Sequence, residues 1–300
     1  MAELLCFGFG YCAAHFVAAF GGKFTPVTGT VRSADRAALL NSGGHAGTGA
    51  SFRAVVFDGA QVTPELADNI ARAEFALVSV PAGANGDPVL AACGERLVAA
   101  GRLRAVVYLS TVGVYGDHGG GWVDEATPPR PGSARGGERL AAEQAWLAFG
   151  ASRGVAVAIL RLAGIYGPGQ NALVQVAKNT ARRVVKPGQI FNRIHVGDIA
   201  QAIDAAFARR AAGIFNVADD APSPPAEPIL FAAELMGRPP PPEIAFDDAA
   251  PAMSPMARSF WQDCRRVRND KLKRELGVTL RYPTFREGLR GLFEEEGSTG

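Results

Sequence analysis

Short apolar runs alternate with alanine-rich stretches over the first half of the chain. The apolar runs occupy residues 3–10, 25–33, 52–59, 75–83, 104–111 and 155–164. They consist of nearly continuous valine, leucine and alanine rather than alternating apolar and polar residues, which is typical of strands covered on both faces. The segments between them have helical spacing. The pattern therefore predicts repeated βαβ units and a doubly wound, mostly parallel α/β sheet with helices on both sides.

This pattern holds to about residue 165 and then changes. Prolines cluster at 219–228 and 237–244, where they interrupt the periodicity. Helices are still expected near 197–210, with Asp198 as the N-cap, and near 269–277, from an asparagine cap to Gly277. We predict a Rossmann domain at residues 1–165. Residues 166–300 then form mainly a smaller substrate-binding lobe, with some elements returning to the Rossmann core.

A glycine-rich turn follows the first expected strand. Gly8, Gly10 and Ala13 form G-x-G-x-x-A, with Tyr11 inside the motif, where a helix should begin. In this context the first glycine permits a tight turn, the second lets the backbone approach a pyrophosphate, and the small third residue lets the helix pack on the strand. The placement favours a dinucleotide site over a glycine turn without a ligand.

The end of the second strand bears on the choice of dinucleotide. An NAD site usually has Asp or Glu there, whereas a cation suits the 2′-phosphate of NADP. This sequence has Thr30, Arg32 and Ser33 instead, so NADP is favoured over NAD, although Arg32 could be an ordinary exposed arginine. Asp58, after the third strand, is expected near the adenine or in a turn.

Composition and charge exclude several classes of protein. The chain has 300 residues, 48% of them hydrophobic, and its 31 basic and 29 acidic side chains give a net charge of +2. No basic run indicates a nucleic-acid partner, and no apolar run reaches the roughly 18 to 20 residues of a membrane span. The four cysteines show no C-x-x-C pair, and no other set has metal-ligand spacing, so we expect no metal. We expect a cytoplasmic protein.

Four later segments carry a family resemblance: "LSTVGVYGDHGGGWVDEATPPRPGSARGGERLAAE" (109–143), "ILRLAGIYGPGQN" (159–171), "FNRIHVGDIAQAI" (191–203) and "GIFNVADDAP" (213–222). Together with the glycine turn, they resemble the extended short-chain dehydrogenase/reductases, the group of NAD-dependent epimerases and dehydratases. The likeness is greatest to an atypical branch that lacks the usual catalytic tyrosine. It implies an NAD(P)-dependent oxidoreductase or epimerase acting on a small carbonyl or hydroxyl substrate, with sugar derivatives among the candidates. It also allows a homodimer.

The resemblance assigns roles to several positions. Thr111 falls where the family places a hydroxyl that binds the reacting oxygen, and Gly164 and Ile165 fall where the backbone contacts the nicotinamide. Arg135 and Arg139 stand in place of the catalytic Tyr-x-x-x-Lys pair. Arginine does not release its proton at ordinary pH, so Arg135 cannot act as the acid.

Arg139 could replace the charge of the lysine, or both arginines could lie on a solvated helix face paired with Glu138 and Glu143. The candidates for moving the proton instead are Tyr166, Tyr115 and His118; for Tyr115 core packing is the favoured role. His195, with Arg193 beside it, is expected near the substrate lobe, where a hydrogen-bonded role at a strand end is favoured. The missing tyrosine leaves a second hypothesis, a dinucleotide-binding sensor or regulatory protein without catalysis.

Overall fold

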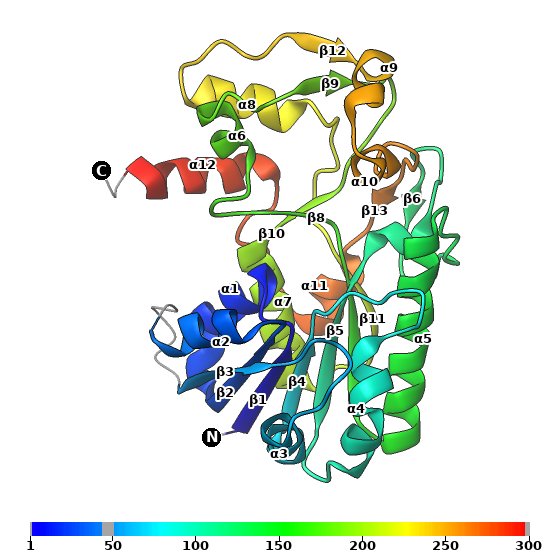
Figure 1. The fold of residues 1–300 in the computed structure, drawn as a ribbon. Coiled ribbons are helices and arrows are strands. Elements are labelled where there is room, and N and C mark those ends of the chain that lie inside the picture. The colour runs from blue at the N-terminus through cyan, green and yellow to red at the C-terminus, as the bar shows by residue number, and fades with distance from the viewer. Residues whose placement is uncertain (1, 44–50, 298–300) are drawn as a thin grey trace.

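A parallel sheet with helices on both faces forms the centre of the molecule (Figure 1). The computed structural model describes residues 2–43 and 51–297. The seven strands lie in the order β11-β7-β5-β4-β1-β2-β3, and every neighbouring pair is parallel. Their bounds are β1 Ala2–Phe7, β2 Phe24–Val31, β3 Phe52–Val56, β4 Phe75–Val78, β5 Ala105–Thr111, β7 Ala156–Leu162 and β11 Gly213–Val217. The predicted doubly wound fold is confirmed.

Two hydrophobic cores lie on the two faces of this sheet. The larger packs the sheet against α1 (Tyr11–Phe20), α2 (Ala34–Asn41), α7 (Val196–Arg209) and α11 (Asp270–Leu276). The other packs it against α3 (Pro64–Arg72), α4 (Pro88–Ala99) and α5 (Ala134–Arg153). Because both faces are covered, the strands need no polar face, which explains their continuous apolar sequence.

The remaining elements form a lobe beyond the carboxyl ends of the strands (Figure 1). It contains α6 (Ala172–Ala177), α8 (Glu227–Leu235), α9 (Phe246–Ala249), α10 (Pro255–Ser259) and α12 (Phe285–Gly297). Its strands pair as β8 (Gly164–Tyr166) with β10 (Arg193–His195), β9 (Arg183–Val185) with β12 (Glu243–Ala245), and β6 (Trp122–Val123) with β13 (Arg266–Val267). Short 3-10 turns are η1 (Gly21–Lys23), η2 (Val112–Tyr115) and η3 (Ala250–Ala252). The later part of the chain also returns to the sheet through α7, β11 and α11.

The expected cap of α7 is wrong. His195, not Asp198, precedes the helix, and its Nδ1 accepts the N–H of Gly197 at 3.1 Å. Asp198 lies inside the first turn and is fully buried, and its carboxylate accepts the backbone N–H groups of Arg281 (2.6 Å) and Tyr282 (3.1 Å). The aspartate therefore holds the segment that leads into α12 instead of capping its own helix.

Both ends of α11 lie where expected, with Asn269 as the N-cap residue and Gly277 as the C-cap. Gly277 closes the helix with a left-handed φ of 61°. Asn269 precedes the helix without a side-chain cap, because its amide donates to the carbonyl of Ala218 at 2.8 Å and to Asp220.

A buried ion pair joins α5 to the sheet. Arg161 on β7 and Glu143 on α5 are each 1% exposed. The Arg161 Nη2 lies 2.7 Å from one Glu143 oxygen, and its Nε lies 3.1 and 3.2 Å from the two oxygens. Ser110, beside Arg161 on β5, also donates to Glu143. This network fixes how α5 lies over the ends of the two strands.

Removing Glu143 should leave a buried unpaired guanidinium. We expect Glu143→Ala to lower the free energy of unfolding by about 3–5 kcal/mol, the range for breaking a buried pair by deleting one partner. Chemical denaturation measures the loss. Glu138→Ala, on the same helix and half-buried, is the control, and an equal loss in both variants would contradict this assignment.

Candidate functional site

The turn after β1 requires its first glycine. Gly8 has φ +86°, and a Cβ there would lie 2.9 Å from the Ser79 Oγ. The N–H of Gly8 donates to the Thr30 Oγ1 at 2.8 Å, and the Ser79 hydroxyl donates to the Gly8 carbonyl at 2.5 Å. The turn is thus fixed between β2 and β4, at the point where the strand order reverses and ligands of such sheets bind.

The start of α1 has the form of a phosphate site. Gly10 is the N-cap, no side chain caps the helix, and its first turn carries no acidic residue. A Cβ at Gly10 would meet no described atom within 4 Å, so the space in front of the helix is open. Ala13 is fully buried against the core. The N–H groups of this turn and the helix dipole fit the diphosphate of a dinucleotide.

Tyr11 connects this turn to the lobe. Its hydroxyl donates to the carbonyl of Pro168 at 3.0 Å. A Cβ at Gly167 would lie 2.7 Å from the same hydroxyl. The start of α1 and the loop after β8 are therefore in direct contact and together form one side of the candidate dinucleotide site.

The end of β2 carries an arginine, Arg32, and no Asp or Glu in the positions next to it. Thr30 is 1% exposed and is already bonded to Gly8. Arg32 is exposed, and the Ser33 side chain caps α2 by accepting the N–H of Arg36 at 3.3 Å.

Asp58 has the contacts of a turn residue. Its carboxylate accepts the N–H groups of Ala60 (2.9 Å) and Gln61 (3.0 Å), and these hydrogen bonds hold its pKa below the usual value.

Thr111 ends β5 with its hydroxyl at the strand edge. The Thr111 Oγ1 accepts the N–H of Gly113 at 3.0 Å and so caps η2. As an acceptor in this bond, the oxygen keeps its own proton to donate. Thr111 is half-buried. The arrangement suits donation to a substrate oxygen above the sheet.

Arg139 reaches the same edge from α5. Its Nη1 donates to the carbonyl of Leu109 at 3.0 Å and to the Tyr108 hydroxyl at 3.1 Å, and its guanidinium lies 5.6 Å from the centre of the Tyr108 ring. Leu109 is two residues before Thr111, so a fixed positive charge lies near the threonine. Arg135 is exposed one turn earlier on the same helix.

The alternative of a solvated helix face holds for Arg135, which is exposed, whereas Arg139 is half-buried. Neither arginine forms the expected ion pair with Glu138 or Glu143 among the described residues. Glu143 is engaged by Arg161 and Ser110 inside the protein. Periodicity could not show this, because the partners come from different elements.

The two tyrosine candidates for proton transfer have other partners. Tyr115 is fully buried and donates to the Asn216 Oδ1 at 2.7 Å, in agreement with the favoured packing role. Tyr166 is 8% exposed, and its hydroxyl lies 3.4 Å from the carbonyl of Thr284. Burial raises the pKa of Tyr166 well above its usual value.

The two histidines are also held by the fold. The His118 Nε2 lies 3.2 Å from the carbonyl of Tyr115. His195 is 5% exposed and packs 4.1 Å from the Tyr282 ring, measured between ring centres. Burial lowers the pKa of His195 to about 4, so this ring is neutral near pH 7. This agrees with the hydrogen-bonded role favoured for it.

Gly164 and Ile165 lie on β8 beyond the sheet. The N–H of Gly164 donates to the carbonyl of Asn192 at 3.0 Å, and the Ile165 side chain is 39% exposed. Their position beyond β7 follows the sequence expectation, whereas their contact with nicotinamide stays a prediction.

Sequence reasoning missed Tyr108 and Ser79. Tyr108 is fully buried, and burial raises its pKa to about 12, so its phenol stays protonated while it accepts from Arg139. Both residues lie in or just after apolar strands. The hydroxyl groups of these two residues, in otherwise apolar runs, were the only sequence feature that could have indicated a role at the site.

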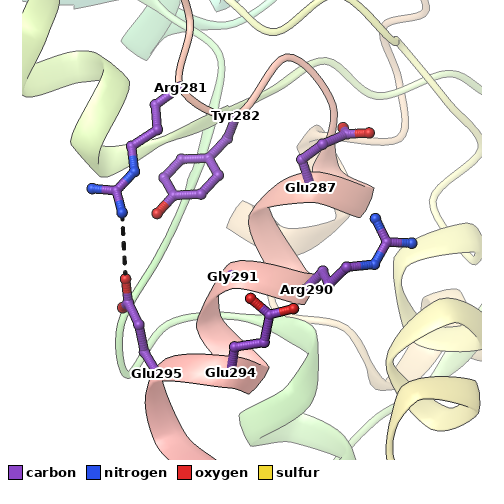
Figure 2. Close-up of a pocket in the computed structure, with 7 residues that line it drawn as sticks. All are labelled: Arg281, Tyr282, Glu287, Arg290, Gly291, Glu294 and Glu295. Carbon is purple, nitrogen blue, oxygen red and sulfur yellow. Dashed lines mark ion pairs between the residues drawn. The ribbon is translucent and has the colours of Figure 1, made fainter. Parts of the chain in front are cut away.

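Two hollows of the structure lie elsewhere. One of about 500 Å³ separates the Arg281–Tyr282 segment from α12 (Figure 2). It is lined by Arg281, Tyr282, Glu287, Arg290, Gly291, Glu294 and Glu295. A second, of about 490 Å³, lies beside α11 and includes Lys271 and Arg274. Neither includes any residue of the site predicted from the sequence.

No group of three His, Cys, Asp or Glu side chains within the described ranges could hold a metal ion. Among the described helices, none is long and apolar enough to cross a membrane.

Comparison with known proteins supports the family resemblance. Residues 86–218 match the model of the NAD dependent epimerase/dehydratase family. This part of the chain is therefore a domain of the NAD dependent epimerase/dehydratase type, within the Rossmann fold described above.

The relatives of this chain differ in what is known of them. The chain is 41% identical to a functionally unknown conserved protein from Silicibacter pomeroyi DSS, over 99% of both chains, with a TM-score of 0.85. The dTDP-glucose 4,6-dehydratase of Bacillus anthracis str. Ames, solved with NAD, shares the fold at 18% identity over 99% of this chain and 97% of that one, with a TM-score of 0.76. A 3-diazoavenalumate denitrifying reductase from Streptomyces sp is 29% identical over 147 residues, 46% of this chain and 48% of the reductase. The chain therefore matches about half the length of that curated relative.

The open space at Gly10 allows a direct test of the dinucleotide site. Gly10→Asp should keep the thermal midpoint, because aspartate is a good N-cap and Gly10 has φ −100°. It should abolish NADP(H) binding, because the carboxylate would enter the pyrophosphate position. Calorimetric titration measures this; unchanged affinity in a folded variant would rule out the binding mode.

Proposed function

We propose that this protein is an NADP(H)-preferring oxidoreductase or epimerase that transfers hydride to or from a small carbonyl or hydroxyl substrate. The observation that carries the proposal is the position of Thr111 and Arg139 at the end of β5. A hydroxyl with a free proton and a fixed cation lie together at the same sheet edge as the Gly8–Ala13 turn.

The residues present fit a dinucleotide. Gly8, Gly10 and the first turn of α1 would hold the diphosphate, with Tyr11 and Ala13 shaping the turn. Arg32 and Ser33 would meet a 2′-phosphate, Asp58 would lie toward the adenine, and Gly164 and Ile165 would lie toward the nicotinamide. The nicotinamide, when bound, supplies or accepts the hydride. The dehydratase solved with NAD supports a nicotinamide dinucleotide in general; the preference for NADP depends on Arg32.

The chain's own residues would then act on the substrate oxygen. The Thr111 hydroxyl donates a hydrogen bond to it, and the positive charge of Arg139 stabilises the negative charge that develops there. Arg139 retains other donors besides Nη1 and could also bind a ribose hydroxyl. The hydroxyls of Tyr115 and Tyr166 are directed to Asn216 and Thr284, so we assign the proton to solvent water.

Sugar derivatives are the first substrate class to screen, because the dehydratase of the same fold acts on dTDP-glucose by its name. A homodimer through α4 and α5 remains part of the proposal.

The second candidate function is a dinucleotide-dependent sensor. It is favoured by Arg135 at the position of the family's acid and by the occupied tyrosine hydroxyls. Such a protein would bind NADPH without oxidising it in the presence of any carbonyl compound.

Arg32 tests the choice of cofactor. Arg32→Ala should weaken NADPH by roughly 10-fold or more, the loss typical of one charged hydrogen bond, and leave NADH nearly unchanged. Fluorescence titration with each nucleotide measures both constants, with Arg36→Ala as the neighbouring control. Equal losses for the two nucleotides would show that Arg32 does not contact the phosphate.

Thr111 tests catalysis. Thr111→Val removes the hydroxyl at nearly constant shape, so kcat should fall roughly 10²- to 10³-fold while the Kd for NADPH stays the same. NADPH oxidation with a substrate found by screening is the assay. Full turnover in this variant would place the chemistry away from β5, and the absence of turnover with every substrate would favour the sensor.

A further inference from the structure

Two cations share one face of α5 above the end of β5. Arg135 and Arg139 are four residues apart, so their side chains leave the helix on the same side. Arg139 points to the strand, where it donates to Leu109 and Tyr108. Arg135 lies just over one turn, about 6 Å along the axis, nearer the N-terminus of the helix.

The first turn of α5 packs directly on the segment after Thr111. A Cβ at Gly136 would lie 3.7 Å from the carbonyl oxygen of Gly113, whose N–H is bonded to Thr111. Arg135 precedes this contact point in the chain. The backbone of Arg135 therefore lies next to the segment that follows Thr111, and its side chain is exposed.

The charge of Arg135 is not balanced by the carboxylates around it. Among the described residues it forms no ion pair or hydrogen bond, and the first turn of α5 has no acidic residue. Glu143 pairs with Arg161, and Asp263 pairs with Arg265 at 3.0 Å. Glu138, three residues after Arg135, forms no ion pair with it among the described residues. An exposed arginine is common. This one lies at the helix start that packs on the segment after Thr111, with Arg139 one turn away, so it adds positive potential where the substrate would bind.

We propose that Arg135 binds a carboxylate of the substrate, next to the carbonyl that Thr111 and Arg139 face. The inference rests on the proposed hydride transfer and adds the substrate class, small carbonyl compounds that carry a carboxylate. A guanidinium binds a carboxylate through two parallel hydrogen bonds, which also orients it. At the position where the resemblance expects a tyrosine that donates a proton, this chain would have an arginine that binds the substrate.

The test measures binding of malonate, a small dicarboxylate, and of malonamide, its uncharged analogue, to the full chain with and without NADP⁺ at low salt. The variants are Arg135→Ala, Arg135→Lys and, as the matched control, Arg153→Ala. Arg153 is exposed at the other end of the same helix, so its loss changes the net charge equally.

Arg135→Ala should raise the Kd for malonate roughly 10- to 100-fold, the loss typical of charged hydrogen bonds. Arg153→Ala should change the Kd for malonate by no more than about twofold. Arg135→Lys should lose less malonate affinity than Arg135→Ala because it keeps the charge. Malonamide should bind to the unmodified protein at least roughly 10-fold more weakly than malonate.

Four results would overturn the proposal. They are no malonate binding by the unmodified protein, equal binding by Arg135→Ala, equal losses in Arg135→Ala and Arg153→Ala, or a loss of NADP⁺ affinity alone, which would assign Arg135 to the cofactor. If malonate binding depends on Arg135 and no NADPH is oxidised with any 2-oxo acid, the hydride-transfer function fails and the anion site stands.

Discussion

The ion pair between Glu143 and Arg161 determines where the candidate site lies. Both side chains are excluded from water, which is costly unless their hydrogen bonds are satisfied. Arg161 and Glu143 make three hydrogen-bond contacts with each other, Ser110 donates a further bond to Glu143, and the Tyr115 ring lies 4.8 Å from the guanidinium. These contacts offset most of the cost, and only the Nη1 of this guanidinium has no hydrogen-bond partner among the described residues. The network spans β5, β7 and α5, so these elements cannot move apart without exposing a charge.

The same helix face carries the arginines of the site. Arg135, Arg139 and Glu143 are spaced by four residues, so fixing Glu143 against β7 also fixes the direction of the other two. Arg139 then meets Leu109 and Tyr108. A structural ion pair at one turn thereby orients a candidate functional cation at the next.

The exchange of Tyr and Lys for two arginines changes what this helix can do. A tyrosine–lysine pair can move a proton and hold a charge, whereas two arginines can only hold charge. The site proposed above has one hydroxyl proton, from Thr111, and two permanent cations. Such a site suits substrates whose reaction needs stabilised negative charge more than an internal acid.

The sequence predicted the parts of the fold that depend on local patterns. The strands up to residue 164, the glycine turn and the left-handed end at Gly277 follow from apolar runs and from backbone needs that glycine alone meets. The partners of Glu143 and Asp198 could not be predicted, because they lie 18 and 83 residues away. Local periodicity indicates that such a carboxylate lies on a helix, and only packing decides which donor it meets.

The contacts that join the sheet to the lobe, here called joints, also could not be predicted from local sequence patterns. Tyr11 on α1 reaches Pro168, and Asp198 on α7 holds the chain at Arg281 and Tyr282. Asn192, before β10, donates to the carbonyl of Arg265 at 2.9 Å and accepts from Val267 at 2.8 Å. Each joint uses a polar side chain to meet backbone groups that no regular ladder satisfies. Because Tyr11 belongs to the dinucleotide turn and Pro168 to the loop after β8, the wall of the proposed cofactor site is itself one of these joints, and its shape depends on how the lobe is held.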